Sequence, residues 1–131
     1  MMKILYIDGD ETSFFVAKKY FTLCGIHPYW RQSLTGSDAL TYLQSSREMP
    51  DLILLDPALP DIYPGEIFHA LDILLVFGKT TVCILTTFLG DELDQLGTGY
   101  LIFKKFSKPF QKHYINELVS YSNRCRLENK M

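Results

Sequence analysis

Short apolar runs recur along the chain, separated by longer segments in which apolar residues return every three or four positions. The first pattern is typical of strands buried on both faces, and the second of helices with one buried face. The expected strands are residues 3–7, 26–33, 52–56, 81–86 and 102–107. Pro28 favours an edge position for the second strand, because proline cannot donate a backbone hydrogen bond.

Helical spacing is clearest after the first strand. There Phe14, Ala17, Phe21 and Cys24 fall on one face, and Gly25 is a natural end for the helix. Asp10, Thr12 and Ser13 are the candidate caps for its start. Further helices are expected from a cap at Ser37, around 67–74, over 90–100 and from about 111 to 124. The helix over 90–100 is predicted to be weak, because two glycines lie near its end.

Five strands alternating with five helices predict an α/β fold with a parallel sheet, right-handed crossovers and helices on both faces. A chain of 131 residues fits one domain. We expect it to span residues 1–122 and to be followed by a polar C-terminal tail at 123–131. The flavodoxin-like strand order 2-1-3-4-5 is the common solution at this size, and it places the first and third strands side by side.

Composition narrows the possible partners and the cellular compartment. The formal charge is −2 and no Lys/Arg cluster stands out, so direct nucleic-acid binding is not expected. The three cysteines are widely spaced, as expected for reduced thiols in a cytoplasmic protein. The most apolar stretch, 71–89, is interrupted by Asp72 and by 78–81, so we expect no membrane insertion. The short apolar start does not resemble a signal peptide.

Polar residues stand at the ends of four predicted strands. Asp8 follows the first strand, Asp56 closes the third, Thr86 closes the fourth, and Lys108 follows the fifth. The carboxyl ends of parallel strands meet at one edge of the sheet, so we expect two carboxylates, a hydroxyl and an ammonium to lie together. Such a set can hold a divalent cation and a phosphoryl group.

Taken in order, these residues resemble the receiver domain of two-component response regulators, the CheY-like family. The resemblance covers roughly residues 3–122. Its motifs are Asp8, the strand 50–56 ending on Asp56, Leu59-Pro60, Thr86, Lys108-Pro109-Phe110, and the helix start Gly36-Ser37-Asp38-Ala39-Leu40. The separations of 30 residues (86 − 56) and 22 residues (108 − 86) also suit the family.

The resemblance implies a function in a phosphorelay. Asp56 would accept a phosphoryl group from a histidine kinase or phosphotransfer protein, with Thr86 and Lys108 contacting that group. Asp8, Asp56 and the backbone carbonyl of Ala58 would hold Mg²⁺, and Asp10 is a further candidate ligand. The chain would be a signalling protein rather than an enzyme. It would act through contacts with a downstream protein, as a monomer or a homodimer, either alone or as part of a longer protein.

Three positions depart from the family pattern. Gly9 stands where the family has a second acid that binds metal directly, so Mg²⁺ binding is expected to be weak. Tyr63-Pro64 replaces the usual Asp-Gly, and Lys105 replaces a switching Tyr or Phe. These departures keep an alternative open: a degenerate pseudo-receiver that docks proteins without phosphorylation.

A phosphatase is the other alternative. Residues 8–12 also fit the Asp-x-Asp-x-Thr motif of haloacid-dehalogenase-type phosphohydrolases, in which Asp8 would be the nucleophile. That family places a further acidic motif after its lysine. Here the candidate acid, Asp56, precedes Lys108, and the chain is too short for a cap domain. The receiver is therefore the favoured interpretation.

Overall fold

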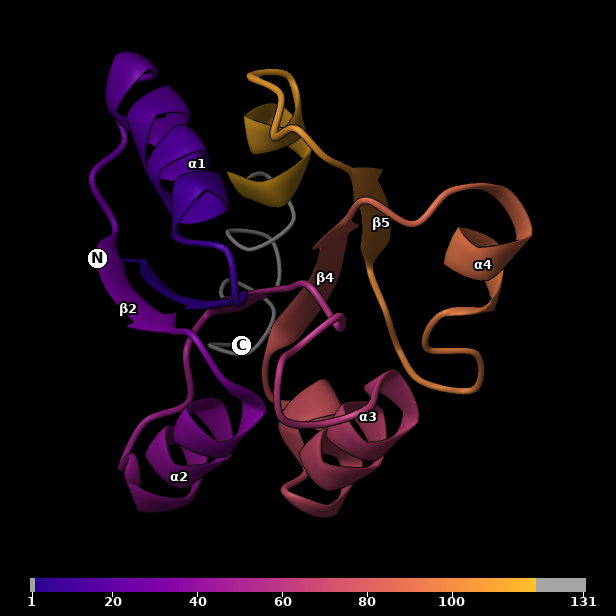
Figure 1. Ribbon diagram of the computed structural model, residues 1–131. Coiled ribbons are helices and arrows are strands. Elements are labelled where there is room, and N and C mark those ends of the chain that lie inside the picture. Colours follow the sequence, from indigo (N-terminus) through magenta and orange to yellow (C-terminus); the bar gives the residue numbers. More distant parts are fainter. Residues whose placement is uncertain (1, 120–131) are drawn as a thin grey trace.

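A five-stranded parallel sheet forms the centre of the molecule (Figure 1). It is seen in a computed structural model that describes residues 2–119. The strands are β1 (Lys3–Ile7), β2 (Tyr29–Ser33), β3 (Leu52–Leu55), β4 (Thr81–Thr86) and β5 (Lys104–Ser107), in the order β2-β1-β3-β4-β5. The predicted fold and strand order are confirmed. The sequence placed the starts of β2 and β5 too early, and β3 ends one residue before Asp56.

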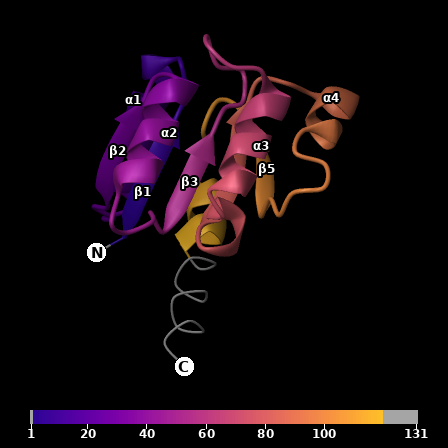
Figure 2. The ribbon, with the colours of Figure 1, turned by 90° about the horizontal axis from the view of Figure 1, so that it is seen from below.

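Helices cover both faces of this sheet (Figure 2). They are α1 (Glu11–Leu23), α2 (Gly36–Ser45), α3 (Pro64–Ile73), a 3₁₀ turn η1 (Val76–Gly78) and α4 (Gly90–Gln95), and residues 114–119 are helical again. The first and last of these helices pack on one face, and α2 and α3 on the other. The predicted domain limit at 122 and the tail at 123–131 lie outside the described residues. Within residues 2–119, no helix is long and apolar enough to cross a membrane.

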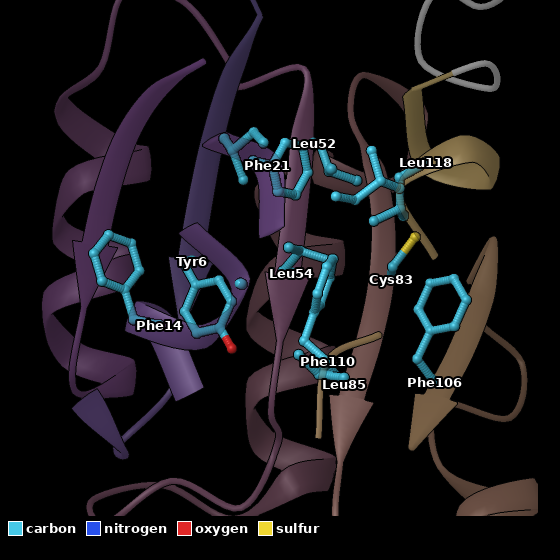
Figure 3. Close-up of a cluster of buried hydrophobic side chains, with 13 residues drawn as sticks. Tyr6, Phe14, Phe21, Leu52, Leu54, Cys83, Leu85, Phe106, Phe110 and Leu118 are labelled. Carbon is cyan, nitrogen blue, oxygen red and sulfur yellow. The ribbon is translucent and has the colours of Figure 1, made fainter. Parts of the chain in front are cut away.

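Two apolar layers sandwich the sheet. Alternate residues of each strand point to opposite faces, so Tyr6 and Leu54 join the layer under α1, whereas Ile7 and Leu55 join the layer under α2 and α3. Figure 3 shows the first layer, in which Phe21 and Phe110 also pack. All four residues of β3 are buried. The polar residue that follows β3, Asp56, therefore lies just beyond the buried part of the strand, at the edge of the sheet.

Local signals account for most helix ends. The carboxylate of Asp10 accepts a hydrogen bond from the Thr12 N–H and caps α1, as one of the three candidates predicted. The predicted cap of α2 was wrong: Thr35, not Ser37, accepts from the Asp38 N–H. The helix predicted over 90–100 ends at Gln95, because Gly97 and Gly99 take φ values of 70° and 91° that continue no helix.

Candidate functional site

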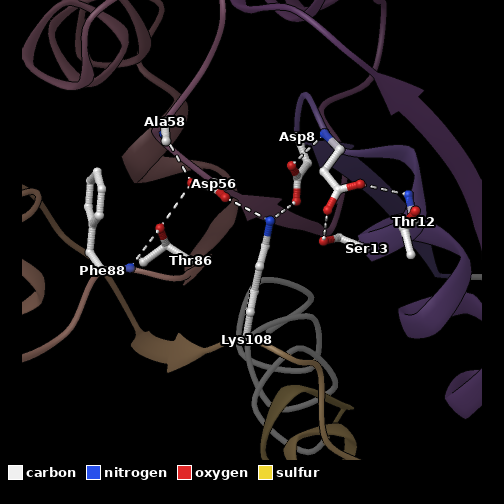
Figure 4. Close-up of polar contacts among 9 residues, drawn as sticks. Asp8, Thr12, Ser13, Asp56, Ala58, Thr86, Phe88 and Lys108 are labelled. Carbon is white, nitrogen blue, oxygen red and sulfur yellow. Dashed lines mark hydrogen bonds and ion pairs between the residues drawn. The ribbon is translucent and has the colours of Figure 1, made fainter.

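A cleft of about 410 Å³ opens at the carboxyl edge of the sheet. The residues that line it are Asp8, Gly9, Asp10, Asp56, Ala58, Leu59, Pro60 and Lys108. Figure 4 shows the polar contacts of Asp8, Asp56, Thr86 and Lys108. Asp8, Asp56 and Thr86 are buried, with exposed fractions of 2%, 6% and 0%. The structure therefore brings together the two carboxylates, the hydroxyl and the ammonium that the sequence placed at the strand ends.

Asp56 is held through both oxygens of its carboxylate. Oδ1 accepts hydrogen bonds from the Thr86 hydroxyl and the Ala58 N–H, each at 3.0 Å, and Oδ2 lies 2.7 Å from the Lys108 Nζ. Its backbone N–H donates to the Ile7 carbonyl at 2.8 Å, which extends the β1–β3 ladder to the edge of the sheet. The carboxylate is thus fixed at the cleft by a hydrogen bond from a hydroxyl and an ion pair with an ammonium.

Lys108 bridges the two acids. Its Nζ lies 2.8 Å from Asp8 Oδ2 as well as 2.7 Å from Asp56 Oδ2, and only 11% of its side chain is exposed. Its backbone N–H donates to the Thr86 carbonyl at 2.9 Å, and its peptide bond to Pro109 is cis. Burial by itself lowers the pKa of Lys108, but hydrogen bonds to Asp56 and Asp8 outweigh it and the pKa is raised. The ammonium therefore stays charged.

Asp8 is the most deeply buried acid of the site. Its Oδ1 accepts from the Asp10 N–H at 2.9 Å, whereas its Oδ2 has the ion pair with Lys108 and no hydrogen bond of good geometry. Burial raises the pKa of Asp8 above that of an ordinary aspartate, even though Lys108 pulls it down. Two carboxylates and one ammonium leave the site with a formal charge of −1, so it favours an additional positive charge.

Asp10 faces the start of α1 rather than the two other acids. Its Oδ1 accepts from the Thr12 N–H at 3.0 Å and its Oδ2 from the Ser13 hydroxyl at 3.2 Å. Hydrogen bonding to Thr12 is the main cause of the lowered pKa of Asp10. Coordination of a metal by this carboxylate would remove the cap of α1, so Asp8 and Asp56 are the better placed acids.

The donor set suits Mg²⁺ in kind. The cation prefers oxygen ligands and keeps several waters, and the cleft offers Asp8, Asp56 and the Ala58 backbone. Within residues 2–119, however, no three His, Cys, Asp or Glu side chains come close enough together to hold a metal. Gly9, which has no side chain, lines the cleft between Asp8 and Asp10 in the sequence. Its φ is not left-handed, and a Cβ there would meet Pro60 Cδ at 3.2 Å, so a shift of a few tenths of an ångström would admit a Cβ.

The loop after Asp56 is tied to α2 by a residue that sequence reasoning missed. Asp61 accepts hydrogen bonds from the N–H groups of Gly36 and Ser37, at 2.8 and 2.9 Å, and these bonds lower its pKa. A Cβ at Gly36 would come within 2.3 Å of Ile62 Cγ2, so glycine permits this close approach. The 25-residue separation left no local signal for the contact.

Lys105 makes a second contact that the sequence did not suggest. Its Nζ donates to the Asp94 carbonyl at 2.7 Å, near the C-terminal end of α4. An ammonium at a helix C-terminus is favourable, because the last carbonyl groups have no partner within the helix. The side chain therefore joins β5 to α4 at the surface.

Several solved structures are similar to this one over nearly its whole length. A two-component response regulator from Legionella pneumophila is 21% identical with a TM-score of 0.81, and the match covers 95% of this chain and 99% of that one. The chemotaxis protein CheY4 of Vibrio cholerae is 21% identical with a TM-score of 0.74, covering 93% and 98%. The BeF3-activated DrrB receiver domain is 25% identical with a TM-score of 0.73, covering 95% and 99%. No protein-family model and no curated protein matches the chain.

Proposed function

From the premise that the chain has the fold of a CheY-like receiver domain, we propose that Asp56 accepts a phosphoryl group from a phosphohistidine. The donor would be a histidine kinase or a phosphotransfer protein. One observation carries the proposal: Lys108 Nζ lies within 2.8 Å of both Asp8 and Asp56, while the Thr86 hydroxyl donates to Asp56. The nucleophile and its counter-charge thus line one cleft, and the buried hydroxyl donor contacts the nucleophile from below it.

The transfer needs little from the protein beyond position and charge. A carboxylate oxygen of Asp56 attacks phosphorus, the P–N bond to the donor imidazole breaks, and the imidazole keeps that electron pair. Lys108 offsets the negative charge on the phosphoryl oxygens, because its ammonium already lies on Asp56. Thr86 can turn its O–H from the carboxylate to a phosphoryl oxygen, since it is in contact with Asp56 before transfer.

Mg²⁺ would be held by Asp8, Asp56 and the backbone carbonyl of Ala58. When bound, it supplies additional positive charge against the phosphoryl oxygens. The formal charge of −1 left by the three side chains supports cation binding, and Gly9 in place of an acid makes that binding weak. Asp8 and Asp56 then carry the protein charge at the site between them.

Output is proposed to pass through protein contacts. The chain would signal in the cytoplasm to a downstream protein that its sequence does not identify, alone or as a homodimer. The proposal includes no turnover of a separate substrate. Asp56 accepts the phosphoryl group, and its phosphorylated form is the signal. Direct binding to nucleic acid is not part of this proposal, since the formal charge is −2.

A pseudo-receiver remains the second candidate, and two observations favour it. Gly9 leaves the site one acid short, and Lys105 is engaged with the Asp94 carbonyl where a switching aromatic would have to move. Such a protein would bind its partner equally well whether or not Asp56 is modified.

Incubation with acetyl phosphate and Mg²⁺, followed by intact-mass measurement, tests the proposal. We expect one added phosphoryl mass that is labile in base and absent from Asp56→Asn. Asp51→Asn is the matched control, because Asp51 lies at the opposite end of β3. An unmodified wild-type chain would favour the pseudo-receiver. Hydrolysis of a generic phosphomonoester that depends on Asp8 would instead favour the phosphatase.

A further inference from the structure

Two buried side-chain atoms lack a hydrogen-bond partner among residues 2–119: the Tyr6 hydroxyl and Asp8 Oδ2. Buried polar atoms are rarely left in this state, because an unsatisfied group costs about 1–3 kcal/mol. One of the two is a donor and the other an acceptor. The Oδ2 atom is compensated by its ion pair with Lys108, but the hydroxyl has no such compensation.

The two atoms belong to neighbouring positions on one strand face. Tyr6 lies in β1 and Asp8 one residue beyond its end, where the Asp8 N–H still donates to the Ser33 carbonyl. The alternation of the strand therefore continues to Asp8 and places both side chains on the same side of the sheet. Tyr6 is 1% exposed and is locked by edge-to-face contacts with Phe14 and Trp30. In Figure 3 its hydroxyl points in the direction in which the strand arrows run, which is toward the edge that carries Asp8.

We propose that the Tyr6 hydroxyl is a positioning group for Asp8. It acts in the state in which Lys108 has moved away from that acid. In the resting state Lys108 forms ion pairs with both Asp8 and Asp56. A phosphoryl group on Asp56 draws the ammonium toward its own oxygens, and Asp8 Oδ2 then loses its counter-charge. The Tyr6 O–H donates to that oxygen, directly or through one water, and holds the buried carboxylate in place.

Ser13 is the other possible partner of the Tyr6 hydroxyl. Burial raises the pKa of Tyr6, and the nearby Ser13 hydroxyl lowers it in part. That hydroxyl donates its own proton to Asp10 Oδ2 at 3.2 Å. A Tyr6–Ser13 pair would stabilise only the start of α1, and its effect on stability would not depend on Lys108. The two explanations therefore differ in which substitution changes the effect of removing the Tyr6 hydroxyl.

A double-mutant cycle on unfolding, run with a metal chelator and without any phosphodonor, tests the proposal independently of phosphorylation. Tyr6→Phe alone should leave the unfolding equilibrium constant unchanged or lower it, because the hydroxyl is unsatisfied in the resting state. In a Lys108→Met background, Tyr6→Phe should raise that constant by about fivefold or more, since Asp8 Oδ2 then has no other donor. Lys108→Gln is the milder background if Lys108→Met does not fold.

The controls separate coupling from packing. Tyr42→Phe removes a hydroxyl from α2 on the opposite face of the sheet and should behave identically in both backgrounds. Equal effects of Tyr6→Phe in the two backgrounds would overturn the proposal. An effect that disappears with Ser13→Ala instead would assign the hydroxyl to Ser13.

A second measurement rests on the proposed function. With acetyl phosphate, Tyr6→Phe should lower the steady-state level of phosphoprotein by about fivefold at subsaturating donor, while the unmodified protein is as stable as wild type. Equal steady-state levels of phosphoprotein in Tyr6→Phe and wild type would count against a role of the Tyr6 hydroxyl as a donor to Asp8. Failure of the wild type to be modified would defeat the proposed function, and the unfolding cycle would still decide the role of Tyr6.

Discussion

At the scale of single residues, the acids near the cleft differ because their neighbours differ. Asp56 is held by a hydroxyl, a backbone N–H and an ammonium, and Asp10 is committed to the start of α1. Asp8 is buried, with Lys108 as its only ionic partner among the described residues. The charge of the site therefore depends on Asp8, and under the proposed function its affinity for Mg²⁺ depends on Asp8 and on the residue at position 9.

Gly9→Asp should tighten Mg²⁺ binding by about tenfold, because a third carboxylate adds a charged oxygen to the cation. The backbone permits the change, since φ at Gly9 is not left-handed. A Mg²⁺ titration by calorimetry measures it. Gly9→Ala is the matched control, because its Cβ makes the same 3.2 Å approach to Pro60 without a charge. If both variants are folded and bind Mg²⁺ with equal affinity, position 9 is not where an additional acid would bind the cation.

Asp8 should make the stability of the metal-free protein depend on pH. Its pKa is raised in the folded state, so its contribution to stability is present below the unfolded pKa of about 4 and is lost as pH rises through the folded value. Asp8→Asn should therefore gain stability relative to wild type as pH rises above about 4. Chemical denaturation in EDTA at a series of pH values measures this gap. A gap that narrows as pH rises would show that Lys108 outweighs the cost of burial.

At the scale of elements, two long-range polar contacts hold the parts around the sheet edge. Asp61 fixes the loop after β3 to the start of α2, and Lys105 fixes β5 to the end of α4. Helix α4 has six residues and no buried side chain, so packing alone stabilises it little. Its order should therefore depend on the ammonium of Lys105.

Lys105→Ala should loosen α4. Loss of a charge-assisted hydrogen bond at a helix C-terminus is worth about 1 kcal/mol, so the amides of α4 should exchange with solvent about fivefold faster. Hydrogen exchange read by mass spectrometry measures this. Lys104→Ala is the matched control, because it removes a neighbouring ammonium that pairs with Glu117 instead. Unchanged exchange in Lys105→Ala, or an equal increase in both variants, would contradict the account.

At the scale of the whole molecule, the sequence predicted the sheet and the members of the site but not their contacts. The alternation of five strands with helices, at this chain length, indicated the strand order. Apolar runs that end on Asp8, Asp56 and Thr86 indicated the edge at which these residues meet. Contacts between distant segments left no periodic or local signal. For this reason the double bridge of Lys108 and the hydrogen bonds from the start of α2 to Asp61 became visible only in three dimensions.

Boundaries were predicted less well than elements. The cap of α2 was assigned to Ser37 although Thr35 provides it, because both are hydroxyl residues near the same helix start and the sequence does not say which one is extended. The buried Tyr6 hydroxyl also escaped prediction. Its ring fits an apolar strand position, and only the packing shows that its oxygen lacks a partner.

The central claim is that Asp56, and not Asp8, carries the phosphoryl group. Both acids line the cleft and both contact Lys108, so the measurement must locate the modified residue. After incubation with acetyl phosphate and Mg²⁺, borohydride reduction converts an aspartyl phosphate to homoserine, and peptide sequencing by mass spectrometry finds its position. The account predicts homoserine at position 56 and aspartate at position 8. Homoserine at position 8 would contradict it and would make Asp8 the nucleophile.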